Sequence, residues 1–173
     1  MASYPFGFRV AQAIGISGAA WLSGNIAALS MNVTPALLRS RREDNVPSAT
    51  LAKQWRNMYE NGKTQNPPIA AAVAASFFYL AWSVRTGAPL FKNTAYSRTA
   101  LFSAAAILTL GIVPFTVAAM SRTNNQLLEK AQSNSGVSDA ETPILIQRWT
   151  TLNGIRGYLP LAGAAVGLVA SFL

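Results

Sequence analysis

Four long apolar runs divide the sequence and constrain its fold more than any other feature. They extend over residues 10–31, 67–84, 99–120 and 152–173. Each is close to the length of about 17–25 residues that an α-helix needs to cross ~30 Å of hydrocarbon. A helix satisfies its own backbone in lipid, and the period-two alternation of a membrane β-strand is missing. The sequence therefore predicts an all-α integral membrane four-helix bundle, a single membrane domain over residues 1–173.

All six acidic residues and most of the basic residues lie between these runs. Only 12% of the chain is charged, and the net charge is +8. Because the bases are scattered among membrane-flanking connections rather than gathered on one surface, we expect contact with the lipid bilayer and no nucleic acid partner. Cysteine and histidine are absent. This composition argues against disulfides, a transition-metal site or a His-dependent triad.

The first run has two interpretations. Its position near the N-terminus and its small residues Ser17–Ala20 are typical of a cleaved signal peptide. Against that, only Arg9 supplies positive charge, and the apolar character continues to Leu29 without a sharp polar boundary. A retained helix is the preferred interpretation.

Four consecutive spans place the connections and termini on two sides of the membrane, and the two sides differ in length and charge. Residues 32–66 and 121–151 fall on one side, and residues 85–98 fall on the other with both termini. The long connections carry nine Lys and Arg residues and the opposite side carries four. The positive-inside rule therefore predicts that the long connections face the cytoplasm.

Local patterns suggest structure inside the connections and the last run. Ser48 followed by residues 49–62 predicts a short amphipathic helix at the interface, between the first two spans. Residues 132–142 resemble a surface turn, after which a helix resumes at Pro143. Pro160 in the last run predicts a kink or a widened turn.

Polar residues inside a membrane are costly, so their positions indicate function. In this chain they concentrate in the halves of the runs nearest the long connections. The helix directions bring eight residues to one level: Asn25, Tyr59, Asn66, Thr116, Asn124, Trp149, Asn153 and Arg156. We expect a pocket at that level.

Arg156 is the most informative of these residues because it lies about one turn into an apolar run. Its guanidinium could snorkel back to the headgroups. However, Trp149, Asn153 and Arg156 share one face of a helix. That face favours a binding site over contact with lipid.

The other candidates also have structural explanations. Thr116 could bond the carbonyl that Pro114 leaves without its usual partner. Asn124 could cap a helix, and Trp55 and Tyr59 could belong to an interfacial aromatic belt. These alternatives stay open beside a role in a pocket.

Several segments resemble motifs of one membrane family. Val113–Leu128 contains Pro-Phe-Thr followed by Asn and Leu, and Trp149–Arg156 contains Trp, then Asn, then Arg. Ser30–Pro35 resembles a polar stretch before Pro, and Trp55–Tyr59 a Trp-x-x-x-Tyr motif. In order and spacing they resemble the four-helix membrane family that includes the fungal anthrone oxygenases. Asn153 stands where many bacterial relatives have His, which removes one proton acceptor.

The resemblance implies a monooxygenase of secondary metabolism that inserts oxygen into a polyketide anthrone and gives an anthraquinone. It implies dioxygen as co-substrate and neither metal nor flavin as cofactor. The acidic methylene of an anthrone yields an aromatic anthrolate, which can pass an electron to dioxygen directly. Together with cytoplasmic connections, the fungal likeness suggests the endoplasmic reticulum. The oligomeric state stays open, a homo-oligomer included.

Within this interpretation each candidate residue receives a role. Arg156 and Asn153 stabilise an oxyanion and Tyr59 relays a proton, as catalytic residues. The substrate-binding residues are Trp55, Phe115 and Trp149, which stack on the polycycle, Thr116 and Asn124, which orient its hydroxyls, and Asn25 and Asn66. With no His and no intramembrane carboxylate, water or the substrate's own phenolate has to serve as base.

Two other functions fit the same sequence. A cyclase or isomerase on this fold would bind a similar polyketide and need only acid–base steps. A non-enzymatic tetraspan partner protein would use the polar cluster to hold its helices together.

Overall fold

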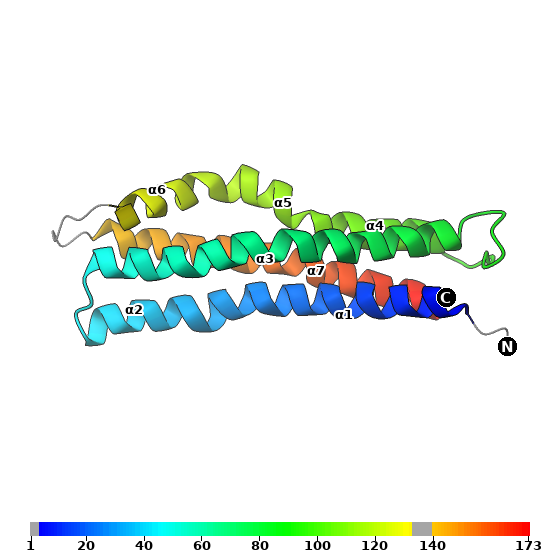
Figure 1. The fold of residues 1–173 in the computed structure, drawn as a ribbon, viewed down its shortest axis with the longest axis horizontal. Helices are drawn as coiled ribbons and strands as arrows, with labels where there is room; N and C mark the ends of the chain where they lie inside the picture. The colour runs from blue at the N-terminus through cyan, green and yellow to red at the C-terminus, as the bar shows by residue number, and fades with distance from the viewer. Residues whose placement is uncertain (1–3, 133–139) are drawn as a thin grey trace. The chain divides into compact units, whose positions relative to one another are not determined.

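The computed structural model describes residues 4–132 and 140–173, and this part of the chain is almost entirely helical (Figure 1). Its elements are α1 (Phe6–Ala28), η1 (Leu29–Val33), α2 (Thr34–Glu43), α3 (Ser48–Ser83), α4 (Arg98–Leu110), α5 (Ile112–Phe115), η2 (Thr116–Met120), α6 (Ser121–Gln132) and α7 (Glu141–Phe172). The two η elements are π-helical turns. Most of the surface turn predicted at 132–142 lies outside the described residues. The all-α prediction is confirmed.

Three helical segments are long and apolar enough to cross a membrane. They are Phe6–Glu43, Arg98–Gln132 and Glu141–Phe172, and they contain the first, third and fourth predicted spans. The protein is therefore a membrane protein. α3 is not among the three: its first half is polar, and Asn66, Pro67 and Pro68 precede its apolar half. The second span stays a prediction.

The connections predicted beside the first two spans are largely helical. The first segment does not end at residue 31 but continues through η1 and α2 to Glu43. The amphipathic helix begins at Ser48 as predicted, yet it is not separate, because α3 runs without interruption to Ser83. Gly62 does not end the helix. It lacks the positive φ that often ends one, because Gly87 is the only glycine with a positive φ in the described residues. Pro67 and Pro68 are accommodated inside α3, although each removes one backbone hydrogen bond.

Widened turns occur, but not where the sequence suggested. α7 is α-helical through Pro160, so the widened turn predicted there is wrong. The two π turns lie next to other prolines: η1 ends two residues before Pro35, and η2 begins two residues after Pro114. In η1 the Thr34 N–H donates to the carbonyl of Leu29, five residues earlier. Such turns absorb one extra residue and are common at functional sites.

The described helices form two compact units. The first unit comprises Met1–Ser23, Asn66–Ile112 and Tyr158–Leu173, and the second comprises Gly24–Gln65 and Val113–Gly157. In each unit, segments of four helical stretches pack around one apolar core. The five acidic residues that the structure describes, Glu43, Asp44, Glu60, Glu129 and Glu141, all belong to the second unit.

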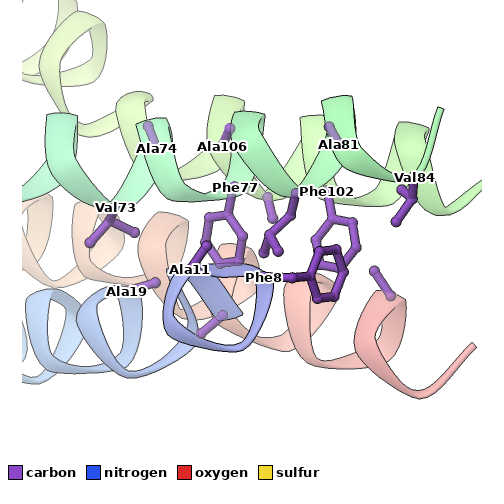
Figure 2. Packing of buried hydrophobic residues seen from close by; sticks show 14 residues of the cluster. Phe8, Ala11, Ala19, Val73, Ala74, Phe77, Ala81, Val84, Phe102 and Ala106 are labelled. Atoms are coloured by element: carbon purple, nitrogen blue, oxygen red, sulfur yellow. The ribbon is translucent and has the colours of Figure 1, made fainter. Parts of the chain in front are cut away.

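The core of the first unit combines a few large rings with many small residues (Figure 2). Phe8, Phe77 and Phe102 are fully buried, and the rings of Phe8 and Phe102 meet edge to face with centroids 6.5 Å apart. Alanines from α1, α3, α4 and α7 fill the space around them. Because lipid is as apolar as this core, close packing through small residues is what holds such helices together.

Gly163 of α7 packs closely against α4, and its substitution should destabilise the first unit. A Cβ at this position would lie 2.7 Å from Thr109 Oγ1 and 2.9 Å from the carbonyl oxygen of Ala105. Because backbone must move, we expect Gly163→Ala to cost about 1–3 kcal/mol. Thermal unfolding in detergent measures this cost, with Gly24→Ala as the matched helical control, since nothing lies within 4 Å of its added Cβ. Equal stability of the two variants would contradict the packing described.

The core of the second unit is built around two tryptophans. Trp55 of α3 and Trp149 of α7 are buried together with Leu51, Met120 and Leu127. The predicted site residues are concentrated in this unit.

Candidate functional site

Arg156 is held inside the second unit by two hydrogen bonds. Its Nη2 donates to Asn153 Oδ1 at 2.6 Å, and its Nη1 donates to Thr116 Oγ1 at 2.9 Å. The first bond follows from the spacing of three residues on α7, whereas the second joins α7 to η2. The guanidinium is thus engaged by protein groups, and the geometry does not support snorkelling.

Asn153 is fully buried and joins Arg156 to the first helical stretch. Its Nδ2 donates to the carbonyl of Ile26 at 2.9 Å and to Ser30 Oγ at 2.8 Å. This orientation of the amide is dictated by chemistry, because a guanidinium has no acceptor and a carbonyl has no donor. Asn153 therefore presents its oxygen to Arg156 in a fixed direction.

Gly157 lets α7 come close to α1 beside these bonds. A Cβ on Gly157 would lie 3.3 Å from Ile26 Cγ2, whereas one on Gly154 would make an ordinary contact with Ser30 Oγ at 3.9 Å. The missing side chain of Gly157 therefore favours the approach that lets the Asn153 amide reach backbone on α1.

A threonine pair adds a second polar contact near the same turn. The hydroxyls of Thr150 and Thr34 are 2.7 Å apart, and Thr34 Oγ1 donates to the carbonyl of Leu29 at 3.1 Å. This contact fixes the widened turn η1 against α7, one helical turn before Asn153.

Aromatic side chains form the other half of the arrangement. Trp55 and Tyr59 stack with centroids 4.9 Å apart and 11° between planes, and Trp55 meets Trp149 edge to face at 5.8 Å. Phe115 packs against this cluster. Tyr59 also interacts electrostatically with Arg156, which joins the aromatic cluster to the polar network.

Several buried polar atoms of the second unit have no hydrogen-bond partner among residues 4–132 and 140–173. They include the donors Trp55 Nε1, Trp149 Nε1 and Arg156 Nε and the acceptor Asn124 Oδ1 on α6. Buried polar groups are nearly always bonded, so each exception needs an explanation. Three N–H donors beside stacked aromatic rings suit a flat, oxygen-bearing ligand.

The structure brings together most of the predicted site residues. Arg156, Asn153 and Thr116 share hydrogen bonds, and Trp55, Tyr59, Trp149 and Phe115 share aromatic packing. Asn124 is buried on α6, and Asn25 is partly buried on α1. Asn66 is buried and belongs to the first unit, and its place in a pocket with these residues stays a prediction.

Ser30, Thr34 and Thr150 belong to the polar network but were not predicted as site residues. The signal available for the first two was the spacing of four between small hydroxyl residues just before Pro35. No group of three or more His, Cys, Asp or Glu side chains that could hold a metal occurs in the described part of the chain.

Comparison with known proteins identifies the family of this chain. A sequence profile described as anthrone oxygenase matches residues 55–166, a stretch that contains Trp55, Tyr59, Thr116, Asn153 and Arg156. The chain belongs to the anthrone oxygenase family. The family resemblance inferred from the sequence motifs is thus confirmed.

Individual fungal relatives cover most of this family member. Anthrone oxygenase encC of Aspergillus fumigatus is 36% identical, over 91% of this chain and 90% of its own length. An anthrone oxygenase of Claviceps purpurea is 31% identical over 89% and 84%. The noranthrone monooxygenase of Aspergillus flavus is 28% identical over 86% and 67%. No solved structure is significantly similar.

Proposed function

We propose that this anthrone oxygenase family member converts a polyketide anthrone to an anthraquinone with dioxygen, without a metal ion or a flavin. The observation that carries the proposal is the buried cluster in which Trp55, Trp149 and Arg156 keep N–H donors without acceptors beside stacked aromatic rings. A flat polycycle bearing several oxygens matches both features. The names of the relatives support the same reaction class.

The reaction balances without an external reductant. The anthrone methylene gives up both C–H bonds, one atom of dioxygen becomes the new carbonyl oxygen, and the other leaves as water. The four electrons released at carbon reduce both oxygen atoms. Loss of one proton gives the anthrolate, electron transfer and recombination give a peroxide at carbon, and loss of water gives the quinone.

Arg156 stabilises negative charge on the anthrolate oxygen in this proposal. Its guanidinium is oriented by Asn153 and Thr116, which leaves the Nε–H unbonded. A preorganised cationic donor lowers the barrier because it needs no reorientation as charge develops. Thr116 acts by holding the guanidinium.

The aromatic residues and Asn124 position the rings of the substrate. Trp55, Trp149 and Phe115 provide flat apolar surfaces, and the two indole N–H groups can donate to quinoid oxygens. Asn124 Oδ1 is an acceptor without a donor, which suits a phenolic hydroxyl of the substrate. Tyr59, stacked on Trp55 and in the field of Arg156, relays the proton.

The base comes from outside the protein in this scheme. The sequence has no His, and its six carboxylates are Glu43, Asp44, Glu60, Glu129, Asp139 and Glu141, none of them in the predicted spans. A phenolate of the substrate or a water molecule takes the first proton.

The proposed location is the endoplasmic reticulum, with residues 32–66 and 121–151 on the cytoplasmic side. The larger number of bases on those stretches supports the orientation. Residues 67–83 of α3 supply the second of the four spans.

Removing dioxygen should abolish product formation. We expect the purified protein in detergent to consume one dioxygen per anthraquinone formed, above the background of autoxidation without protein, and to be unaffected by chelators. Labelled dioxygen should put one atom in the quinone carbonyl and one in water. A product formed at full rate under argon would instead identify a cyclase or isomerase. Failure of any hydroxylated anthrone to bind or react would favour the tetraspan partner protein.

A further inference from the structure

Arg98 is a buried cation in the first unit whose charge the proposed oxygenase reaction does not use. It is the first residue of α4 and only 3% exposed. Its Nε donates to the carbonyl of Ala170 on α7 at 3.1 Å. Its Nη1 and Nη2 have no hydrogen-bond partner within the described part of the chain. A buried guanidinium normally has most of its five donors satisfied, so two unmatched nitrogens indicate an acceptor from outside the protein.

No acidic side chain of this unit can supply that acceptor. The stretches that make up the first unit contain four bases, Arg9, Arg85, Lys92 and Arg98, and neither Asp nor Glu. Burying a charge without a counter-charge is strongly unfavourable. A bound anion would remove that cost.

A second cation, Lys92, lies near the same aromatic ring as Arg98. Lys92 Nζ is 5.4 Å from the centroid of the Tyr4 ring, and Arg98 Cζ is 5.6 Å from the same centroid. Burial alone raises the pKa of the Tyr4 phenol, but the neighbouring Lys92 and Arg98 outweigh that effect and lower the pKa below its usual value. The local potential is therefore positive. Contact with the ring compensates the cations in part, yet it gives the two Nη groups no hydrogen bond.

The position of these three residues fits the headgroup layer. Tyr4 precedes α1, Lys92 lies in the connection between α3 and α4, and Arg98 begins α4. All three are at ends of the long helices, where lipid headgroups meet a membrane protein. Lys92 is exposed and Tyr4 is partly exposed, so a ligand from outside the protein can reach these two side chains.

We propose that Arg98, Lys92 and Tyr4 form a binding site for a phosphate group, supplied by an anionic phospholipid headgroup or by free phosphate. The planar guanidinium pairs with two phosphate oxygens at once, which satisfies both Nη groups. The Lys92 ammonium adds a second positive charge, and the Tyr4 hydroxyl donates to a remaining oxygen. The site is independent of the oxygenase site, which belongs to the second unit.

Binding to the full chain in neutral detergent tests this site. The ligands are phosphatidic acid, phosphatidylglycerol, phosphatidylcholine and inorganic phosphate, each at constant ionic strength, with binding read by native mass spectrometry and by the shift in unfolding temperature. We expect the two anionic lipids to bind and to raise the unfolding temperature, and phosphatidylcholine to do neither. A response to inorganic phosphate alone identifies free phosphate as the source, and a response to lipid only identifies the headgroup.

Substitutions locate the binding. Arg98→Gln should weaken it roughly ten- to hundredfold, as expected for loss of charge-assisted hydrogen bonds, and Lys92→Gln should weaken it less. Arg85→Gln is the matched control, because Arg85 donates within its own segment to the carbonyl of Trp82 at 2.6 Å and stacks on that ring at 3.6 Å. Its binding should equal that of the unmodified protein.

Three outcomes would overturn the proposal. They are equal binding of all lipids, no binding of any phosphate, and full binding by Arg98→Gln. If Arg98→Gln does not fold, Lys92→Gln and Tyr4→Phe decide the matter, and unchanged binding by both would overturn it as well.

Discussion

Arg156→Gln is expected to lower turnover of an anthrone about 10²–10³-fold while the protein stays folded. Glutamine keeps a polar group but removes the positive charge and the Nε–H donor that has no partner inside the protein. Loss of one preorganised donor to a developing oxyanion has an effect of this size. The measurement is the initial rate of anthraquinone formation at saturating substrate, corrected for autoxidation.

Arg148→Gln provides the matched control for this variant. Arg148 lies on α7 about two turns before Arg156 and is exposed. Turnover by Arg148→Gln should equal that of the unmodified protein, and the unfolding temperatures of both variants show whether each has folded. Unimpaired turnover by a folded Arg156→Gln protein would remove Arg156 from the catalytic role proposed for it.

Local spacing in the sequence predicted much of the site. Residues three or four apart on a helix share a face, and the contacts of Asn153 with Arg156 and of Trp55 with Tyr59 follow directly from that rule. The apolar runs predicted helices for the same reason, since membrane-spanning backbone has few alternatives. In both cases the prediction depends only on the geometry or backbone hydrogen bonding of a single helix.

Helix boundaries could not be predicted in this way. The length of an apolar run indicates which residues can contact lipid, but it does not indicate the residue at which the helix ends. α1 and α2 are joined through η1 well past the apolar run, and α3 passes Gly62 and two prolines. What continues these helices is packing in the second unit, such as Leu51 and Trp55 against Trp149. That contact joins residues far apart in the sequence.

The π turns explain why some residues were missed. One extra residue in a turn rotates everything that follows by about 100° relative to an unbroken α-helix. Assigning residues to helix faces as if η1 were α-helical therefore gives the wrong faces after it. For this reason Ser30 and Thr34 were not predicted to contact α7.

A substitution of Asn153 can test the effect of the positive charge of Arg156 while the Arg156 side chain itself is kept. The side-chain oxygen accepts from Arg156 and the side-chain nitrogen donates to Ile26 and Ser30. Asn153→Asp keeps the size and the bond to the guanidinium, but it loses the donation to the Ile26 carbonyl and adds a negative charge beside Arg156. The resulting ion pair would neutralise the positive potential that the proposed anthrolate needs.

We therefore expect Asn153→Asp to lower turnover about 10²-fold even though Arg156 is unchanged, a loss within the usual range for an oxyanion donor. Thr150→Val is the matched control, because it removes another polar contact of α7, that with Thr34, one turn away. It should cost about 0.6–1.7 kcal/mol of stability, as such contacts do in membranes, and leave turnover intact. Rates and unfolding temperatures of both variants are measured together. Equal turnover by the two would show that the charge of Arg156 does not act on the substrate, whereas a slow but stable Asn153→Asp protein would show that it does.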